Sequence, residues 1–569
     1  MAEEAVRLVE LRVLEGPNIY FPRPAIKLTL SVGGWMDLSE ERAAGVAEGL
    51  GLPGSPRPGL PGSGQRLRFA ARVGAHLTRG LARATGTRLA VRARPGPEPD
   101  QVVVAFPWRR RTHAESLGRE VAQLAGSVGA DPTALDRLVE EAAGRLRRVE
   151  PGDLPDLPTP TVPIVAITGT NGKTTTVRLL AHIGQTAGRT VSYTSTDGVF
   201  LEGKLVEEGD YSGFLGARMA LSQPGVELVV LETARGGILL RGIGAPHNDV
   251  AVVTNVSADH IGLHGIRTLD QLADVKAAIT RITKPEGWDV LNADDPRVLA
   301  MRRGMTGRPF LFTMDADHPA IRWAITERGR ALTVLEGSMV VVDRGMSVRA
   351  LVPLEDVPAT LAGVASHHVQ NAMAAAAAAL GVGMSEDEVV QGLRTFLPDQ
   401  ERNPGRANVF ELDRRVVVID YAHNEEGMRG LVEICRGLRP PGREIWVTIC
   451  AAGDRSREIR RGIGYVAARG VEHVVITELR RYLRGEDPEE IVGDLRDGAI
   501  DGGAADVQVF PDELHSLEWM LEMSSPGDVV SVAALSQRWE IFALLDERGG
   551  RRAGPDRVRE LARAARAPT

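Results

Sequence analysis

The sequence is poor in cysteine and contains no long apolar run. Cys435 and Cys450 are the only cysteines in 569 residues, too few for a disulfide framework. Each lies in an apolar stretch, which favours a small core residue over a redox pair. The first residues of the sequence do not show a cationic segment followed by a hydrophobic run and a cleavage site, so we expect no signal peptide. No apolar run reaches membrane-spanning length, and the run 374–379 is typical of a helix interior. We therefore expect a cytoplasmic protein with no membrane partner.

An excess of basic residues is also missing. The formal net charge is −7, which argues against non-specific nucleic-acid binding. The one notably basic stretch is the tail from Arg551 to Arg566, where arginine alternates with alanine and leucine. That pattern favours a solvated terminal helix over a nucleic-acid site.

The chain is long enough for three domains, and its overall class is predicted to be α/β. Residues 1–158 alternate strand-like and helical runs and end in a proline-rich linker, which predicts a small α+β domain. Residues 159–400 open with a strand, a glycine turn and a helix, which predicts a P-loop-type, doubly wound central domain. Residues 401–569 alternate strands and helices again and predict a Rossmann-like carboxy-terminal domain.

The strongest local motif follows the apolar run 164–168. Its members are Gly169, Thr170, Asn171, Gly172, Lys173, Thr174 and Thr175. A glycine turn lets backbone N–H groups approach phosphates, and the N-terminus of the following helix adds a favourable dipole. Lys173 supplies a positive charge and the Thr174 hydroxyl suits magnesium. The loop is shorter than the generic one, since Ile167 occupies the position of its first glycine.

Two further candidates follow predicted strands of the same central sheet. Glu232 ends the run 229–231, and His260 follows the run 252–255. In a parallel sheet both would project from the edge that carries the phosphate loop, which favours a metal role for the pair. Asp259 is the alternative in this segment, as a simple cap of the next turn.

The third block carries polar residues at its own strand ends. Arg406 precedes its first strand and would stabilise charge during phosphoryl transfer if it faced the phosphates. Asp420 follows the run 416–419 and suits a ribose hydroxyl. Gly453-Asp-Arg455 follows the run 445–449 and either orients a second substrate or forms an ordinary turn.

Taken in order, these motifs resemble the Mur ligase superfamily, and within it the cyanophycin synthetases. The resemblance is carried by the segments 169–175, 195–198, 232–238, 255–260, 291–296, 369–372 and 420–424, with Lys276 and Arg406 between them. The run 15–18 also resembles the amino-terminal domain of the cyanophycin synthetases. That domain is expected to bind an acceptor or to serve assembly, and the resemblance alone implies a homo-oligomer.

The resemblance implies a role for each matching residue. Lys173 would hold the ATP phosphates, Thr174 and Glu232 would bind one magnesium, and His260 a second. Lys276, a helix residue that composition would not single out, would be the carbamylated lysine of the family. Asn292 and Asn371 would lie near the adenine and ribose, Arg406 near the γ-phosphate and Asp420 on the ribose. An Asx turn before Pro296 is the competing interpretation of the segment 292–295.

The sequence also departs from these families. Cyanophycin synthetases carry an ATP-grasp domain between their amino-terminal and Mur-like parts, whereas here the linker 150–163 joins the two directly. One of their two ligations is therefore expected to be missing. His368 stands where the family often has asparagine, and Glu425 where proline is usual.

We therefore predict an ATP- and magnesium-dependent ligase that activates a carboxylate as an acyl phosphate and couples it to the amine of an amino acid. The carboxylate would belong to an acid or an acidic peptide. Two alternatives stay open at this point. One is a non-catalytic ATP-binding scaffold, and the other is an ATPase that forms no amide.

Overall fold

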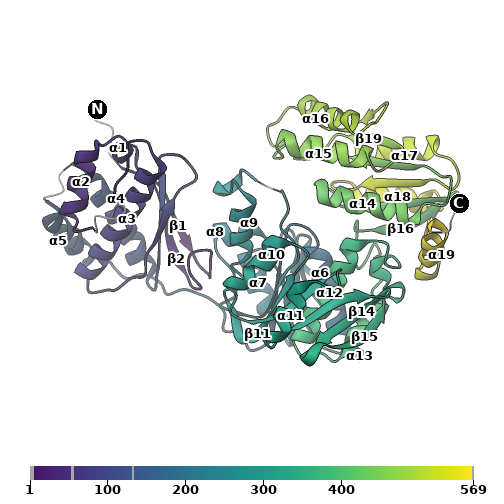
Figure 1. The fold of residues 1–569 in the computed structure, drawn as a ribbon, viewed down its shortest axis with the longest axis horizontal. Helices are drawn as coiled ribbons and strands as arrows, with labels where there is room; N and C mark the ends of the chain where they lie inside the picture. Colours follow the sequence, from purple (N-terminus) through teal and green to yellow (C-terminus); the bar gives the residue numbers. More distant parts are fainter. Residues whose placement is uncertain (1–5, 53–56, 131–133, 260, 567–569) are drawn as a thin grey trace.

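The computed structural model describes residues 6–52, 57–130, 134–259 and 261–566. Over these residues the chain forms three sheets, of four, eleven and seven strands. Figure 1 shows them as three lobes: purple at the left, teal in the middle, and green to yellow at the upper right. We call them the N-terminal lobe (7–146), the middle lobe (164–395) and the C-terminal lobe (405–565, which includes the segment just before β16). The predicted α/β class, with an α+β amino-terminal part, is confirmed.

The N-terminal lobe is an antiparallel sheet with helices on one face. Its strand order is β1-β2-β4-β3. The strands are β1 Arg7–Leu14, β2 Ala25–Ser31, β3 Arg92–Pro95 and β4 Gln101–Pro107, and the helices are α1 Gly33–Met36, α2 Glu40–Gly49, α3 Gly64–Ala84, α4 Arg111–Ala130 and α5 Leu135–Leu146. Apolar residues that alternate along β2 and β4, such as Leu28 and Val104, bury against α3 and α4. Residues 151–163 then lead directly to the first strand of the middle lobe.

The other face of this sheet packs against the middle lobe. Leu14, Tyr20 and Ala105 share one apolar cluster with Ile238 and Val275 of the middle lobe. The two lobes therefore have a common core on this side, and the linker is not their only connection.

A backbone contact fixes the same docking. The amides of Glu15 and Gly16 donate to the Arg241 carbonyl oxygen at 2.8 and 3.2 Å, and the Ile243 amide donates to the Pro17 carbonyl oxygen at 2.7 Å. The side chain of Glu15 pairs with Arg241 at 2.8 Å. A Cβ atom on Gly16 would lie only 1.8 Å from the Ile243 carbonyl oxygen, so this approach requires glycine.

The middle lobe is built on a long mixed sheet. Its order is β15-β14-β13-β12-β11-β10-β5-β9-β6-β7-β8, with parallel pairing from β13 to β6 and antiparallel strands at both edges. The strands are β5 Ile164–Thr168, β6 Val191–Ser195, β7 Gly198–Leu201, β8 Lys204–Glu208, β9 Leu228–Glu232, β10 Asn248–Val253, β11 Thr283–Asn292, β12 Arg308–Thr313, β13 Arg330–Leu335, β14 Ser338–Asp343 and β15 Ser347–Pro353. The central strand β5 is fully buried, as its continuous apolar run predicts.

Helices cover both faces of this sheet. The helices α6 Lys173–Thr186, α12 Ser366–Gly381 and α13 Glu386–Thr395 lie on one face; α7 Phe214–Leu221, α8 Arg235–Leu240, α9 Leu269–Lys276, α10 Pro296–Ala300 and α11 Pro319–Thr326 belong to the other. The alanine run of α12 is fully buried, so the helix approaches the strands closely. A capping box of Thr268 and Gln271 starts α9.

The C-terminal lobe repeats this doubly wound plan. Its order is β20-β19-β18-β21-β17-β16-β22, parallel from β20 to β17. The strands are β16 Asn408–Leu412, β17 Arg415–Asp420, β18 Ile445–Ile449, β19 His473–Thr477, β20 Gln508–Phe510, β21 Val529–Ala533 and β22 Arg551–Arg552. The helices are α14 Glu425–Leu438, α15 Arg457–Ala468, α16 Pro488–Asp501, α17 Glu513–Met523, α18 Arg538–Glu547 and α19 Pro555–Ala565. Cys435 and Cys450 are buried in this lobe, as expected of core residues.

The basic tail forms helix α19, which is docked and not solvated all round. Val558 and Leu561 are buried against the C-terminal lobe. On another side, Arg559 donates to the Glu355 carbonyl oxygen at 3.0 Å and Arg563 pairs with the Glu355 carboxylate at 3.0 Å. The tail thus ties the C-terminal lobe to the middle lobe.

No helix in the described ranges is both long enough and apolar enough to cross a membrane.

We predict that Gly16→Ala loosens the N-terminal lobe from the middle lobe. Its methyl group must push the loop off residues 241–243, at an expected cost of about 1–3 kcal/mol. Amide hydrogen exchange should become faster at residues 15–18 and 241–243, and thermal unfolding should begin at a lower temperature. Gly80→Ala in α3 is the control, because its Cβ meets nothing within 4 Å. Wild-type exchange rates in Gly16→Ala would contradict the prediction.

Candidate active site

A cavity of about 620 Å³ opens between the middle and C-terminal lobes. From the middle lobe it is lined by the phosphate loop 169–175, Glu232, the start of α8, Lys276 and the first turns of α12. From the C-terminal lobe it is lined by Arg406, the segment 420–423, Arg455 and Tyr482. The carboxyl ends of β5, β9 and β17 thus meet around one space, as expected for parallel sheets.

The phosphate loop is shaped by two glycines. Gly172 has φ +85° and caps the N-terminus of α6. A Cβ atom there would lie 2.1 Å from Asn371 Oδ1, and one on Gly169 would lie 1.8 Å from Thr254 Oγ1. The loop therefore brings bare backbone against α12 and β10. Lys173 Nζ donates to the Thr170 carbonyl oxygen at 2.9 Å, so its ammonium lies over the loop.

Glu232 lies at the bottom of this cavity with Thr174. Its Oε2 accepts a hydrogen bond from Thr174 Oγ1 at 2.9 Å, while its Oε1 has no hydrogen-bond partner among the described residues. The side chain is 2% exposed. Burial raises the pKa of this carboxyl, while nearby Lys173 and Arg406 act to lower it. A hydroxyl beside a carboxylate with one free oxygen is a donor set that suits magnesium.

Lys276 is the last residue of α9 and is buried at 3% exposure. Burial lowers the pKa of its ammonium well below the usual value, and neighbouring Lys173 lowers it further. The Asp259 carboxylate acts in the opposite direction and raises the pKa of this ammonium. The structure therefore places an amine with a strong tendency to be neutral in the wall of the cavity.

Two residues of the C-terminal lobe complete the ring around the phosphate loop. Arg406 donates to Thr174 Oγ1 at 3.4 Å, and its guanidinium lies over the Tyr421 ring at 4.8 Å. Asp420 accepts a hydrogen bond from the Ala407 amide at 2.8 Å, and burial raises the pKa of its carboxyl to about 6. Cations from both lobes thus face the same loop.

The motif 195–198 holds the two lobes together. Asp197 binds Arg178 of the middle lobe and Arg538 of the C-terminal lobe, both at 2.6 Å. Although burial alone would raise it, these two arginines hold the pKa of the Asp197 carboxyl below its usual value.

Asn292, a predicted site residue, is not among the described residues that line the cavity. Asn292 donates to the Thr254 carbonyl oxygen at 2.8 Å and accepts from the Asp294 amide at 3.0 Å. The bond from the Asp294 amide forms an Asx turn, which is the competing interpretation of the segment 292–295. His260 lies outside the described residues. In the described ranges, no group of three or more His, Cys, Asp or Glu side chains is arranged to hold a metal ion.

Several cavity residues were not predicted. His367 and His368 line the wall with their rings 4.4 Å apart. Burial lowers the pKa of His367 to about 4 and also holds the pKa of His368 well below its usual value. Tyr482 and Arg484 enter from the segment after β19. The strand-end rule that found Asp420 would have found this segment, because it follows the carboxyl end of a parallel strand.

Comparison with known families agrees with this arrangement. A model described as Mur ligase middle domain matches residues 167–379. One described as Mur ligase, glutamate ligase domain matches residues 405–534. Together they cover more than half of the chain. The chain belongs to the Mur ligase family.

Relatives of this Mur ligase family member include cyanophycin synthetases. That of Crocosphaera subtropica is 38% identical over 375 residues, which are 65% of this chain and 42% of the relative. The matched part of the chain thus spans less than half the length of these cyanophycin synthetases.

Solved structures share the fold. FolC of E. coli in complex with ADP has a TM-score of 0.51 at 19% identity, covering 68% of this chain and 90% of that chain. A bifunctional folylpolyglutamate synthase/dihydrofolate synthase with Mn, AMPPNP and L-glutamate bound has a TM-score of 0.50 at 18% identity, with coverage of 68% and 90%.

We predict that Glu232→Gln stabilises the ligand-free protein at pH 8. Because burial raises the pKa of Glu232, ionisation of this carboxyl costs stability as the pH rises, and glutamine removes that cost while keeping the bond to Thr174. The midpoint of thermal unfolding should rise by a few degrees at pH 8, and the gain should shrink as the pH falls toward 4.5, the ordinary pKa.

Glu207→Gln is the matched control, since Glu207 lies on the exposed strand β8. Equal midpoints for the two variants at pH 8 would show that the Glu232 charge carries no such cost.

Proposed function

We propose that this chain is an ATP- and magnesium-dependent ligase that joins a carboxylate to the amine of an amino acid. The observation that carries the proposal is the convergence of Lys173, Thr174, Glu232, Arg406 and Asp420, from two lobes, on one cavity. Membership of the Mur ligase family supports it.

The cavity residues fit a magnesium nucleotide. The backbone amides of the phosphate loop, Lys173 and Arg406 would hold the phosphates, and Asp420 would accept a hydrogen bond from a ribose hydroxyl. Thr174 and the free Oε1 of Glu232 would bind magnesium, with His260 as ligand of a second ion. Asn371 would lie beside the nucleotide through its contact with Gly172, whereas the Asx turn of Asn292 supports only an indirect role. ATP would supply the phosphoryl group that activates the carboxylate as an acyl phosphate.

Lys276 supports a carbamylated lysine. Carbamate formation needs a neutral amine, whose nitrogen attacks carbon dioxide and loses a proton to give a carboxylate on the side chain. Burial and the neighbouring Lys173 favour that neutral amine in the unmodified protein. The product would be an anionic oxygen ligand in the cavity wall, which a second magnesium would require.

The two organic substrates would meet on the side of the cavity away from β5. Arg455, Tyr482 and Arg484 line the cavity from the C-terminal lobe. In this proposal the C-terminal lobe positions the amine. The basic groups on its wall orient the carboxylates of the substrates. Enclosure between two lobes would keep water from the activated acid.

Other parts of the interpretation remain predictions. We take the units 1–158, 159–400 and 401–569 as domains, the first serving acceptor binding or assembly. A cytoplasmic location and a homo-oligomeric state are likewise expected.

We predict that phosphate release from Mg-ATP requires both an acid and an amine. Purified protein would be incubated with Mg-ATP, candidate acidic peptides and a pool of amino acids, with phosphate and product mass followed together. The expected product is heavier than the acid by one amino acid less water. Lys173→Met should lower the rate by about 100-fold or more, because a charge facing the phosphates is lost.

Lys204→Met, on the exposed strand β8, is the matched control and should react as wild type does. Phosphate release without either partner would indicate an ATPase. Nucleotide binding with no phosphate release across the pool would indicate a binding protein.

We also predict that nucleotide affinity depends on pH through Asp420. The pKa of this carboxyl is about 6, so it becomes a charged acceptor as the pH rises through that value. Calorimetry with Mg–AMP-PNP should show binding that tightens above pH 6 in wild type. Asp420→Asn should bind about tenfold more weakly at high pH, since one charged hydrogen bond is lost. Parallel pH curves for the two proteins would rule out this role.

A further inference from the structure

The segment that follows β10 is bound tightly to the phosphate loop. The Thr170 amide donates to the Asn255 carbonyl oxygen at 2.9 Å, and the Asn171 amide donates to Asn255 Oδ1 at 2.8 Å. Asn255 Nδ2 in turn donates to the Asn171 carbonyl oxygen at 3.1 Å, and the Ser257 amide donates to Thr170 Oγ1 at 3.0 Å. Four hydrogen bonds over two residues of the loop mean that the loop and the segment 255–257 move as one piece.

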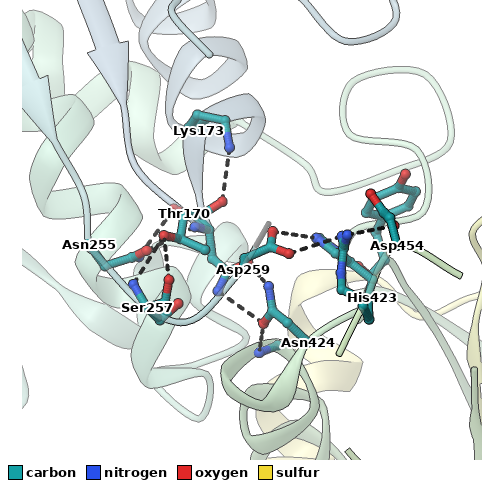
Figure 2. A network of polar contacts seen from close by, with 12 residues as sticks. Thr170, Lys173, Asn255, Ser257, Asp259, His423, Asn424 and Asp454 are labelled. Carbon is teal, nitrogen blue, oxygen red and sulfur yellow. Dashed lines mark hydrogen bonds and ion pairs between the residues drawn. The ribbon is translucent and has the colours of Figure 1, made fainter. Parts of the chain in front are cut away.

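The same segment reaches across to the C-terminal lobe. Asp259 is 5% exposed and pairs with Arg455 at 3.0 Å between Oδ1 and Nη2. Its Oδ2 lies 3.5 Å from His423 Nε2. Figure 2 shows its carboxylate pointing from the segment beside Ser257 toward His423. Asp259 therefore does not simply cap a turn: it joins the lobes through a buried ion pair.

The phosphate loop itself makes a second connection. Asn171 Nδ2 donates to Asn424 Oδ1 at 3.2 Å, and Asn424 Nδ2 donates to Asn171 Oδ1 at 3.0 Å. Asn424 Oδ1 also accepts from the Gly427 amide at 2.9 Å and so caps α14 (Figure 2). A reciprocal pair of amides forms only when both side chains are in register, so a small rotation of either lobe breaks both bonds.

These two connections depend on each other. A buried ion pair such as Asp259–Arg455 is stable only while both charges stay paired, because separation leaves charge in an apolar environment until water enters. The amide pair of Asn171 and Asn424 carries no charge, but it too is lost when the lobes separate, because its two members belong to different lobes. The interface therefore favours a fully seated C-terminal lobe or a hydrated, separated one over intermediate positions.

We propose that Asp259 and Asn424 are positioning residues that make the seating of the C-terminal lobe depend on the state of the phosphate loop. Asn171 is two residues from Lys173, so a nucleotide that orders the loop orders the seat of Asn424 as well. In the ligase proposed above, on which this inference rests, seating would bring the amine-binding lobe into place before the activated acid meets water. The pair thus acts on the fate of the activated acid through the position of the C-terminal lobe.

The test uses Asp259→Asn, which removes the charge facing Arg455, and Asn424→Ser, which keeps a side-chain cap for α14 but loses the amide pair. Asp497→Asn is the control, because Asp497 pairs with Arg461 at 2.6 Å within the C-terminal lobe. The readouts are the phosphate released per amide formed, the rate of amide formation and the affinity for Mg–AMP-PNP.

Both test variants should release several phosphates per amide where wild type and Asp497→Asn release about one. Amide formation should fall about tenfold, as for the loss of one charged hydrogen bond, while nucleotide affinity changes less than about threefold. A ratio that stays at the wild-type value in both variants would overturn the proposal. So would a proportional fall of rate and affinity, which indicates a merely structural role.

A second measurement separates this proposal from the ligase function. Small-angle scattering of the full chain, with and without Mg–AMP-PNP, reports the seating of the C-terminal lobe even if no amide is ever formed. Wild type should become more compact with nucleotide, and Asp259→Asn should lose most of that change. An equal change in both proteins would overturn the coupling and leave the ligase function untouched.

Discussion

The buried carboxylate of Glu232 is the constraint around which the site is arranged. A charge at 2% exposure is unfavourable by itself, and the nearest compensation comes from Lys173 on the phosphate loop and Arg406 on the C-terminal lobe. The two cations belong to different lobes. The group best suited to bind a divalent ion therefore also attracts the lobes to each other. The charge balance of the cavity thus depends on how the two lobes are arranged.

Much of this arrangement follows from sequence by one rule. Continuous apolar runs such as 164–168 and 445–449 are buried parallel strands, and polar residues just past such runs collect at one edge of a sheet. The rule predicts Glu232 at the edge that carries the phosphate loop and Asp420 at the carboxyl end of its own strand, whereas Arg406 precedes a strand and lies outside the rule. The rule works because all strands of a parallel sheet run in the same direction, so that their carboxyl ends lie along one edge. It misses the edges, where β8 and β15 are exposed and their residues follow no simple apolar alternation.

The remaining features depend on partners distant in sequence. The helix that ends at Lys276 looks amphipathic from its residues alone, and only tertiary packing around the cavity wall buries its lysine. Asn292 satisfies its amide within its own turn, an outcome that a motif match does not reveal. Asp259 has an unremarkable local context, and its pairing with Arg455 exists only because two lobes meet.

The shared core of the N-terminal and middle lobes bears on how such chains change length. The docking surface is made by the loop 15–18, the sheet of the N-terminal lobe and helices α8 and α9, and the segment 151–163 merely runs between anchors on either side of it. A connection of this kind tolerates the insertion of a whole domain, because the interface it spans does not depend on its length. The fold thus offers a natural point of modular growth, at which a further domain can be inserted while the two lobes stay docked.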